Sequence, residues 1–169
     1  AGLAAEADRT VAAYRTAAEA LHATRLTAAV RLDAAVAAEL APLRLDAARF
    51  RTAVTALPED RWGPQGMDAV EFLIATNPGA PFAPLNKIAS GGELSRFLLA
   101  LKVALADRGS APTLVFDEID TGVGGAVADA IGQRLKRLSS TVQVLSVTHA
   151  PQVAARAATH LLISKGPAG

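Results

Sequence analysis

The sequence predicts an α/β fold preceded by one long helix, and three observations lead to this prediction. Residues 1 to 41 have high helix propensity, with no proline before Pro42. Two short apolar runs, 112–118 and 142–149, have the length and composition of strands buried in a parallel sheet. Helical segments alternate with these runs, which is typical of an α/β sheet with right-handed crossovers.

Composition narrows the possible classes of protein. A chain of 169 residues can form one domain with a core and an appendage. It has no cysteine, which excludes disulfides and thiolate metal sites. The net charge of +1 and the aromatic content of 4% do not indicate a nucleic-acid binder with a base-stacking platform. Because no apolar run is long enough to span a membrane, we expect a soluble cytoplasmic protein with no membrane partner.

The segment 1–41 predicts a coiled-coil arm. Its first half carries apolar residues at alternating spacings of three and four, and then the apolar stripe shifts. A helix of this length spans roughly 55–60 Å, which is long for a globular domain. We therefore expect one strand of a coiled coil whose partner helix is absent from this chain; the alternative is an amphipathic helix lying on the domain. The seam comprises Val11, Tyr14, Ala18, Leu21 and Arg25, and the shifted stripe Leu26, Val30, Val36, Leu40 and Leu43.

Residues 42–169 form the predicted second domain, which begins where Pro42 ends the helix. Two segments, 47–56 and 68–77, alternate apolar and polar residues and predict an antiparallel pair, followed by a loop over 77–87. The remaining predicted elements are a helix at 93–107, a strand at 112–118, a helix at 125–139, a strand at 142–149, a short helix at 151–158 with proline in its first turn, and a third strand at 160–165.

The stretch Ser90-Gly91-Gly92-Glu93 is the first candidate site. Ser90 suits the N-cap of the helix that follows, and the two glycines leave the backbone N–H groups open to an anion. The partial positive charge of the helix start favours the same ligand. This pattern indicates a phosphate site, although a tight turn before a capped helix would look alike.

Two adjacent carboxylates form the second candidate site. Asp117 and Glu118 end an apolar strand, at the sheet edge where open α/β sheets bind ligands. Asp117 suits a Mg²⁺ held through water beside phosphates, and Glu118 suits a general base that activates a water molecule. The alternative is an acidic strand end that caps the following helix.

The third candidate is His149, which follows the next apolar strand. It is expected at the same sheet edge, where an imidazole can bind a phosphate or the attacking water.

Asp120 opens a loop with three glycines that lacks the lysine of a phosphate-binding P-loop, so we interpret it as a contact loop. His22 and His160 have no constellation around them in the sequence and are interpreted as structural. The arginines of the arm are interpreted as a solvated face and not as a DNA track: Arg9, Arg15, Arg25 and Arg31.

The order of these motifs resembles the C-terminal half of an ABC-type ATPase head. Such heads carry a signature motif, a Walker B strand, a D-loop and a switch histidine in this order. A helical arm leading into this half is similar to the SMC group, and most of all to the RecN family of SMC-like DNA repair ATPases. Three stretches carry that similarity: "FLIATNPGAPFAPLNKIASGGELSR", "TLVFDEIDTGVGG" and "VTHAPQVAARAATHLLISK".

The resemblance implies roles for the candidate residues. Ser90, Gly91, Gly92 and Glu93 would contact ATP bound on a second head, because two such heads enclose two nucleotides between them. Asp117 would position Mg²⁺, and Glu118 would activate water. Asp120 would serve the contact between heads, and His149 would sense the γ-phosphate. The implied cofactors are ATP and Mg²⁺, and the implied partners are a second head and DNA, with a nucleoid-associated location.

The chain also departs from the family pattern, because no Walker A motif or glutamine loop is present. The resemblance places these in an N-terminal lobe that precedes the coiled coil. We therefore expect an incomplete head that does not hydrolyse ATP alone. Two other classes stay open: a structural coiled-coil protein with an inactive head, and the ATPase subunit of a transporter.

Overall fold

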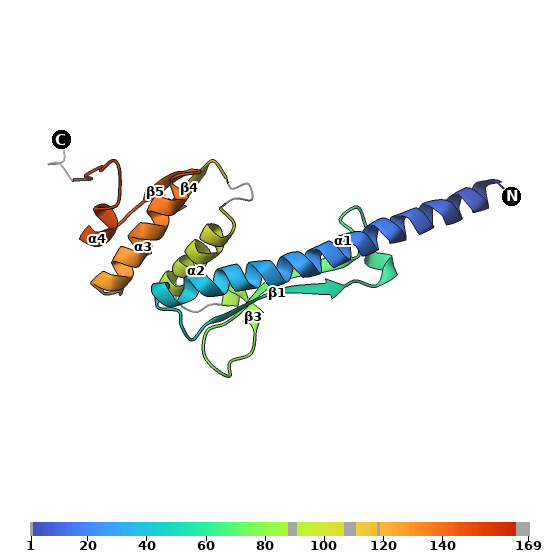
Figure 1. Cartoon of the computed structure of the whole chain (residues 1–169), viewed down its shortest axis with the longest axis horizontal. Helices are drawn as coiled ribbons and strands as arrows, with labels where there is room; N and C mark the ends of the chain where they lie inside the picture. The colour runs from blue at the N-terminus through green and yellow to red at the C-terminus, as the bar shows by residue number, and fades with distance from the viewer. Residues whose placement is uncertain (1, 88–90, 107–110, 118, 165–169) are drawn as a thin grey trace. The chain divides into compact units, whose positions relative to one another are not determined.

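The chain forms two compact units, each described here by itself. The computed structural model describes residues 2–87, 91–106, 111–117 and 119–164 (Figure 1). The helix–hairpin unit comprises residues 1–38 and 47–88, and the α/β unit comprises residues 39–46 and 89–169. The predicted division into 1–41 and 42–169 follows chain order, whereas the compact units join the long helix to the strands that come after it.

Helix α1 (Gly2–Leu40) has 39 residues, and at 1.5 Å per residue it is about 58 Å long, as predicted. It ends immediately before a short 3-10 turn, η1 (Ala41–Leu43), which contains Pro42. Proline has no N–H to donate and its ring blocks the preceding turn, which explains the end of the helix. In the part of the chain that the structure describes, no helix is both long and apolar enough to cross a membrane.

The helix–hairpin unit contains the predicted antiparallel pair. Strand β1 (Arg49–Ala56) pairs with β2 (Asp68–Ala75), with Phe50 opposite Ile74 and Val54 opposite Val70. The predicted antiparallel pair is confirmed, and the structure adds its register. The segment predicted as a loop also contains a two-residue strand, β3 (Ala83–Pro84), which pairs with β2, and a 3-10 turn, η3 (Leu85–Lys87).

Within this unit α1 runs along the hairpin (Figure 1). Ala18, Ala29 and Val36 are buried on one side of the helix, while Leu26 and Val30 are 45% and 71% exposed. Of the predicted seam, Tyr14 and Arg25 bond to the hairpin and Ala18 is buried, whereas Val11 and Leu21 are 51% and 37% exposed. Pairing of another side of α1 with a second helix stays a prediction.

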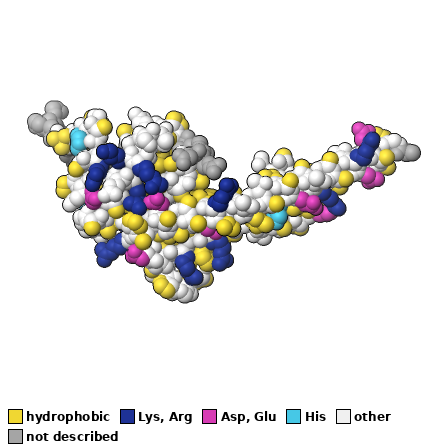
Figure 2. Space-filling view, in the orientation of Figure 1, with side chains coloured by type: hydrophobic (Ala, Val, Ile, Leu, Met, Phe, Trp, Pro, Cys, Tyr) yellow, Lys and Arg dark blue, Asp and Glu magenta, His cyan; other side chains and the backbone are white. Residues whose placement is uncertain are grey.

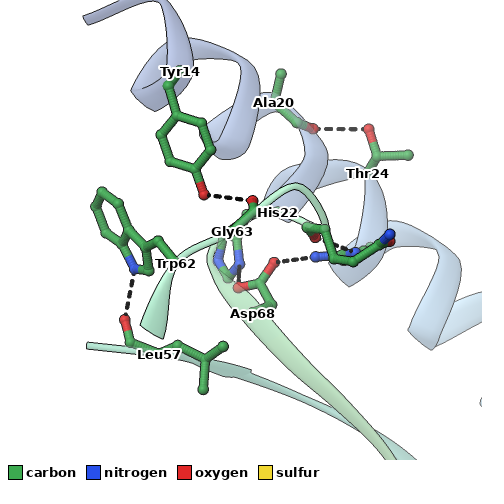
Figure 3. Close-up of polar contacts among 10 residues, drawn as sticks. Tyr14, Ala20, His22, Thr24, Leu57, Trp62, Gly63 and Asp68 are labelled. Carbon is green, nitrogen blue, oxygen red and sulfur yellow. Dashed lines mark hydrogen bonds and ion pairs between the residues drawn. The ribbon is translucent and has the colours of Figure 1, made fainter. Parts of the chain in front are cut away.

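A buried carboxylate fastens the hairpin to α1 (Figure 3). The side chain of Asp68 has no exposed surface; it lies 2.7 Å from the His22 Nδ1 and accepts a 3.3 Å hydrogen bond from the Arg25 Nη1. The Tyr14 hydroxyl donates to the Gly63 carbonyl at 3.0 Å. We call Asp68, His22 and Arg25 the hairpin clamp. The sequence predicted no polar partners around His22, and this was wrong, because Asp68, 46 positions away in the chain, contacts it. The predicted structural role of His22 agrees with its place in the clamp.

The arginines of α1 do not form one exposed series. Arg15 donates to Glu59 and Arg25 binds the hairpin, so these two are fastened to the unit and are not merely solvated. In Figure 2, basic and acidic side chains are interspersed along α1 and do not gather into one basic patch on the face shown. This distribution gives no support to a DNA track along the helix.

The α/β unit has helices on one face of a parallel strand pair. Strands β4 (Thr113–Phe116) and β5 (Gln143–Ser146) are parallel, with Phe116 opposite Ser146. Leu114 and Phe116 are buried. The helices are α2 (Gly91–Ala104), α3 (Gly125–Leu138) and α4 (Pro151–Ala154). These agree with the predicted order, with shorter strands and a shorter last helix.

The predicted third strand at 160–165 is wrong for the residues described. Residues 160–164 have no regular structure, and Leu161, Leu162 and Ile163 are 85%, 94% and 91% exposed; residue 165 lies outside the described residues. A strand needs a neighbour for its backbone N–H and C=O groups, and a β-favouring composition cannot supply one. The face of β4–β5 opposite the helices is also bare, since Val115 and Val147 are 67% and 59% exposed.

The core of the α/β unit fixes the loops that follow its strands. Phe97, Leu99, Ile119 and Ile131 are fully buried. Ile119 lies in the loop after β4, so burial of this side chain anchors that loop. Each large side chain of this kind contributes roughly 1.5–3 kcal/mol on burial.

Helix α4 packs closely on α3 at one glycine. A Cβ added at Gly132 would lie 3.1 Å from the Gln152 carbonyl oxygen and 2.8 Å from a side-chain carbon of Arg156. The Arg156 Nη2 also donates to Asp129 of α3 at 2.7 Å. Gly132 is therefore required for the close approach of α4, the helix that follows the predicted switch histidine.

Candidate functional site

Helix α2 begins with the glycine pair that the sequence singled out. Gly91 and Gly92 are its first residues, two positions earlier than the predicted start at 93, and Glu93 completes the first turn. A Cβ at Gly91 would meet nothing within 4 Å, so the backbone there faces open space. Ser90 lies outside the described residues, and its predicted capping role stays a prediction.

Among the described residues of the α/β unit, no close contact requires glycine at position 91 or 92. A Cβ at Gly92 would lie 3.4 Å from the Arg96 Nη1 and 3.7 Å from the Thr121 carbonyl oxygen, which are ordinary contacts. Glycine in a helix costs about 0.5–1 kcal/mol relative to alanine. Both positions have room for a Cβ, so the predicted phosphate role stays the reason proposed for these glycines.

The predicted acidic pair follows β4. Asp117 is exposed directly after the strand ends at Phe116, and Glu118 lies outside the described residues. Among the described residues, no group of three or more His, Asp or Glu side chains could hold a metal by itself. Mg²⁺ beside a nucleotide commonly uses one or two carboxylates plus phosphate oxygens, so the exposed Asp117 carboxylate fits that kind of site.

Asp120 joins the loops that follow the two strands. Its buried carboxylate accepts a short hydrogen bond from the Thr148 hydroxyl and a 3.1 Å bond from the Ala150 N–H. Its second oxygen, Oδ1, has no hydrogen-bond partner among the described residues and lies 3.9 Å from the His149 Nδ1. In this geometry Asp120 holds the segment 148–150 to the loop after β4.

The same contacts explain the protonation of Asp120. Burial raises the pKa of this carboxyl, but the hydrogen bonds from Thr148, its own backbone N–H and Ala150, with the nearby His149, outweigh burial and hold the pKa below its usual value. Asp120 is therefore ionised at neutral pH. A negative charge beside the Nδ1 of an imidazole favours the tautomer that carries a proton on that nitrogen.

His149 is presented to the outside at the end of β5. Its side chain is 76% exposed, and Pro151 begins α4 two residues later. Because β4 and β5 are parallel, Asp117 and His149 both follow carboxyl ends at one sheet edge, as the sequence predicted. An exposed imidazole anchored through its backbone can contact a ligand without leaving its loop.

The described parts of three predicted motifs therefore meet in one unit. The first turn of α2 lies beside the loop after β4 through Gly92 and Thr121, and that loop is joined to the one after β5 through Asp120 and Thr148. Sequence reasoning missed Thr148, the donor to Asp120, and Arg96, a buried arginine on α2. Thr148 directly precedes His149, so a hydroxyl next to the candidate histidine was the available signal. For Arg96 the signal was its position one helical turn after Gly92.

Comparison with curated proteins connects this chain to one family. It is 47% identical over 154 residues to the DNA repair protein RecN of Xylella fastidiosa, covering 91% of this chain and 28% of that protein. Against the protein of the same name from Streptomyces coelicolor it is 49% identical over 158 residues, covering 88% of this chain and 28% of that protein. The resemblance to RecN is confirmed. The chain spans less than a third of the length of these RecN proteins, and no family model matches it.

Solved structures similar to the chain are SMC heads. An Smc head domain with an extended coiled coil, from Pyrococcus furiosus, gives a TM-score of 0.54 at 23% identity, over 75% of this chain and 30% of that one. A structure titled for ATP-driven dimerization and DNA-stimulated activation of SMC ATPases gives a TM-score of 0.51 at 19% identity, over 86% and 83%. These likenesses confirm the predicted fold, a lobe of an SMC-type ATPase head preceded by a long helix.

Proposed function

We propose that this chain supplies half of a composite ATP-hydrolysing site in a RecN-type DNA repair protein. The observation that carries the proposal is the convergence of the glycine start of α2, the loop after β4 and the loop after β5 within one unit. A helix start open to an anion, carboxylates at a strand end and an exposed histidine are the groups that phosphoryl transfer to water requires.

The proposed division of work is as follows. Gly91 and Gly92, with Ser90 and Glu93, contact the phosphates of ATP held by a second head. Asp117 holds Mg²⁺, which when bound neutralises charge on the phosphate oxygens. Glu118 accepts the proton of the attacking water, and His149 binds the γ-phosphate. Asp120 fixes the loop that carries His149, in addition to the head contact proposed from the sequence.

The site requires parts that this chain does not contain. A phosphate-binding loop with its lysine is absent from the sequence, so an N-terminal lobe is the proposed source. The bare apolar face of β4–β5 is consistent with a covering lobe, because parallel sheets are ordinarily covered on both faces. ATP binding would join two heads and hydrolysis would part them, moving the arms and the DNA they hold in the nucleoid.

Hydrolysis by a complete head tests the proposal, with this chain joined to its N-terminal half. We expect ATP turnover that rises with linear DNA and is lost in Glu118→Gln. The matched control is Glu71→Gln, the same change at an exposed carboxylate of β2, which should leave turnover unchanged. Turnover that persists in Glu118→Gln would remove Glu118 as the base, and no turnover at all would favour a structural coiled-coil protein with an inactive head.

This chain alone is expected to show no ATP turnover, because the nucleotide's main phosphate contacts are missing. Measurable turnover by the isolated chain that disappears in Glu118→Gln would contradict the composite site. In a complete head, ATP turnover that does not change with DNA would support the ATPase assignment and would indicate that the arms hold another cargo. The transporter alternative has no observation in its favour among the described residues.

A further inference from the structure

Arg96 is a buried charge without full compensation. It lies on α2, one turn after Gly92, and it is 9% exposed. Its Nε is buried and has no hydrogen-bond partner among the described residues. An arginine is almost never buried unless its donors are satisfied, because an unsatisfied donor of a charged group is costly. The position therefore requires an explanation beyond packing.

The guanidinium is directed back toward the start of its own helix. The Arg96 Nη1 lies 3.4 Å from the place that a Cβ of Gly92 would occupy. A side chain at position 92 would contact this nitrogen, and glycine places none there. The orientation follows from helix geometry, because side chains lean toward the N-terminus of an α-helix.

The surroundings make this location positive before any ligand arrives. The first turn of α2 carries the partial positive charge of a helix start. Burial lowers the pKa of the Arg96 guanidinium; attraction to Glu93 opposes that shift, and repulsion from Arg44 adds to it. Arg96 thus has both a carboxylate and a second arginine near enough to affect its pKa. A bound anion would relieve this repulsion, whereas the free chain bears it.

We propose that Arg96 is a further phosphate-binding residue, whose guanidinium joins the first-turn N–H groups of α2 to receive a phosphate oxyanion of the nucleotide on a second head. This inference rests on the proposed function and adds to it a residue outside the glycine motif. Arginine suits the role because its planar, always charged fork matches phosphate geometry. With an arginine at this position, dimerisation of the heads depends more strongly on the phosphates of the bound nucleotide.

The test measures the joining of complete heads in the Glu118→Gln background, which traps ATP. Sedimentation gives the dimer dissociation constant with ATP and with ADP, and nucleotide titration gives the affinity of a single head. We expect Arg96→Met to weaken ATP-dependent dimerisation at least about tenfold, in line with loss of a charge-assisted hydrogen bond. ATP affinity of the single head should not change. Lys136→Met, at an exposed position in the last turn of α3, is the control and should dimerise normally.

Thermal unfolding without nucleotide separates binding from structure. We expect Arg96→Met to unfold at the same or a higher temperature, because it removes a buried charge of no use to the free head. An unchanged dimer constant would overturn the proposal. If stability and dimerisation both fall, Arg96→Lys decides, because it retains the charge without the planar fork. ATP-dependent dimerisation tighter than in Arg96→Met supports phosphate binding, and dimerisation no tighter than in Arg96→Met contradicts it. If complete heads that carry only Glu118→Gln do not dimerise with ATP, the proposed function, a composite site shared by two heads, is contradicted.

Discussion

Three buried charged residues, Asp68 in the helix–hairpin unit and Arg96 and Asp120 in the α/β unit, are paired to different degrees. In the helix–hairpin unit the buried Asp68 has both oxygens engaged by the hairpin clamp. In the α/β unit the buried Arg96 Nε and Asp120 Oδ1 have no hydrogen-bond partner among the described residues. A fully paired buried network stabilises a particular geometry, whereas a partly paired one leaves atoms for something else to bind. Thr52 of the first unit also has an unpaired buried oxygen and Glu39 of the second is fully paired, so the contrast concerns these residues and not whole units. We infer that Asp68 fixes the hairpin on α1 and that Arg96 and Asp120 keep atoms available to a ligand.

The contrast also appears in the glycines. Gly66 of the hairpin has φ +90, and a Cβ there would lie 3.0 Å from Leu21 of α1, so glycine is required by the fold. Gly91 has open space around it and no such requirement. What surrounds a glycine thus distinguishes one that the fold requires, such as Gly66, from one that the fold merely tolerates, such as Gly91.

The largest effect is expected from breaking the hairpin clamp. Asp68→Ala leaves His22 and Arg25 without their buried partner, and we expect a loss of about 2–4 kcal/mol in unfolding free energy. Trp62, the chain's single tryptophan, lies in the hairpin beside Tyr14, so its fluorescence follows this unit during denaturation. Asp8→Ala, at an exposed position of α1, is the control. A Trp62 transition unchanged in Asp68→Ala would contradict a stabilising clamp.

Asp120→Asn should act on the other unit and depend on pH. We expect a loss of about 2 kcal/mol at neutral pH, because the amide weakens two hydrogen bonds to a charged acceptor. The folded-state pKa of Asp120 lies below its usual value. Its stabilising contribution is therefore present above the unfolded value near pH 4 and is lost as pH falls through the folded pKa. Wild type and variant should converge in acid; a constant difference would exclude Asp120 as the cause.

A smaller effect is expected at the packing of α4 on α3. Gly132→Ala gains up to about 1 kcal/mol of helix propensity but places a methyl group against the backbone of α4, which costs about 1–3 kcal/mol. We expect a net destabilisation of about 1 kcal/mol and faster hydrogen exchange in residues 148–155. Gln133→Ala, one position along on the exposed side, should not speed this exchange. Equal exchange in both variants would show that α4 does not depend on the glycine.

The smallest change in unfolding free energy is expected for Gly91→Gln, which should also cause the largest loss of ATP turnover. A Cβ at Gly91 would meet nothing within 4 Å, so we expect Gly91→Gln to stabilise α2 by up to about 1 kcal/mol, because glycine is a poor helix residue. In a complete head the same side chain would cover the helix start and abolish ATP turnover. Destabilisation, or normal turnover, would show that the glycine serves another purpose.

Much of the fold was predictable because its signals are local. The end of α1 at Pro42 follows from proline chemistry, the antiparallel pair from side-chain periodicity, and the positions of β4 and β5 from their apolar runs. The strand predicted at 160–165 failed because pairing depends on a neighbour and not on composition. The clamp of Asp68 on His22 was invisible because it joins residues far apart in sequence.

The candidate site was predictable to the level of motifs but not of contacts. The sequence placed Gly91, Asp117 and His149 where helix and strand ends put them. It could not place the carboxylate of Asp120 on Thr148, nor bury Arg96, because both depend on how loops and helices pack. These contacts turn three separate motifs into one region of the α/β unit.

The central claim, that this chain completes a nucleotide site on a second head, is tested most directly by mixing two inactive heads. One head carries Gly91→Gln, and the other has its N-terminal phosphate-binding loop disabled. If the site is composite, each mixed dimer contains one intact site, and an equal mixture should recover roughly a quarter of wild-type ATP turnover, since about half the dimers are mixed. No recovery, with mixed dimers present in solution, would contradict the account.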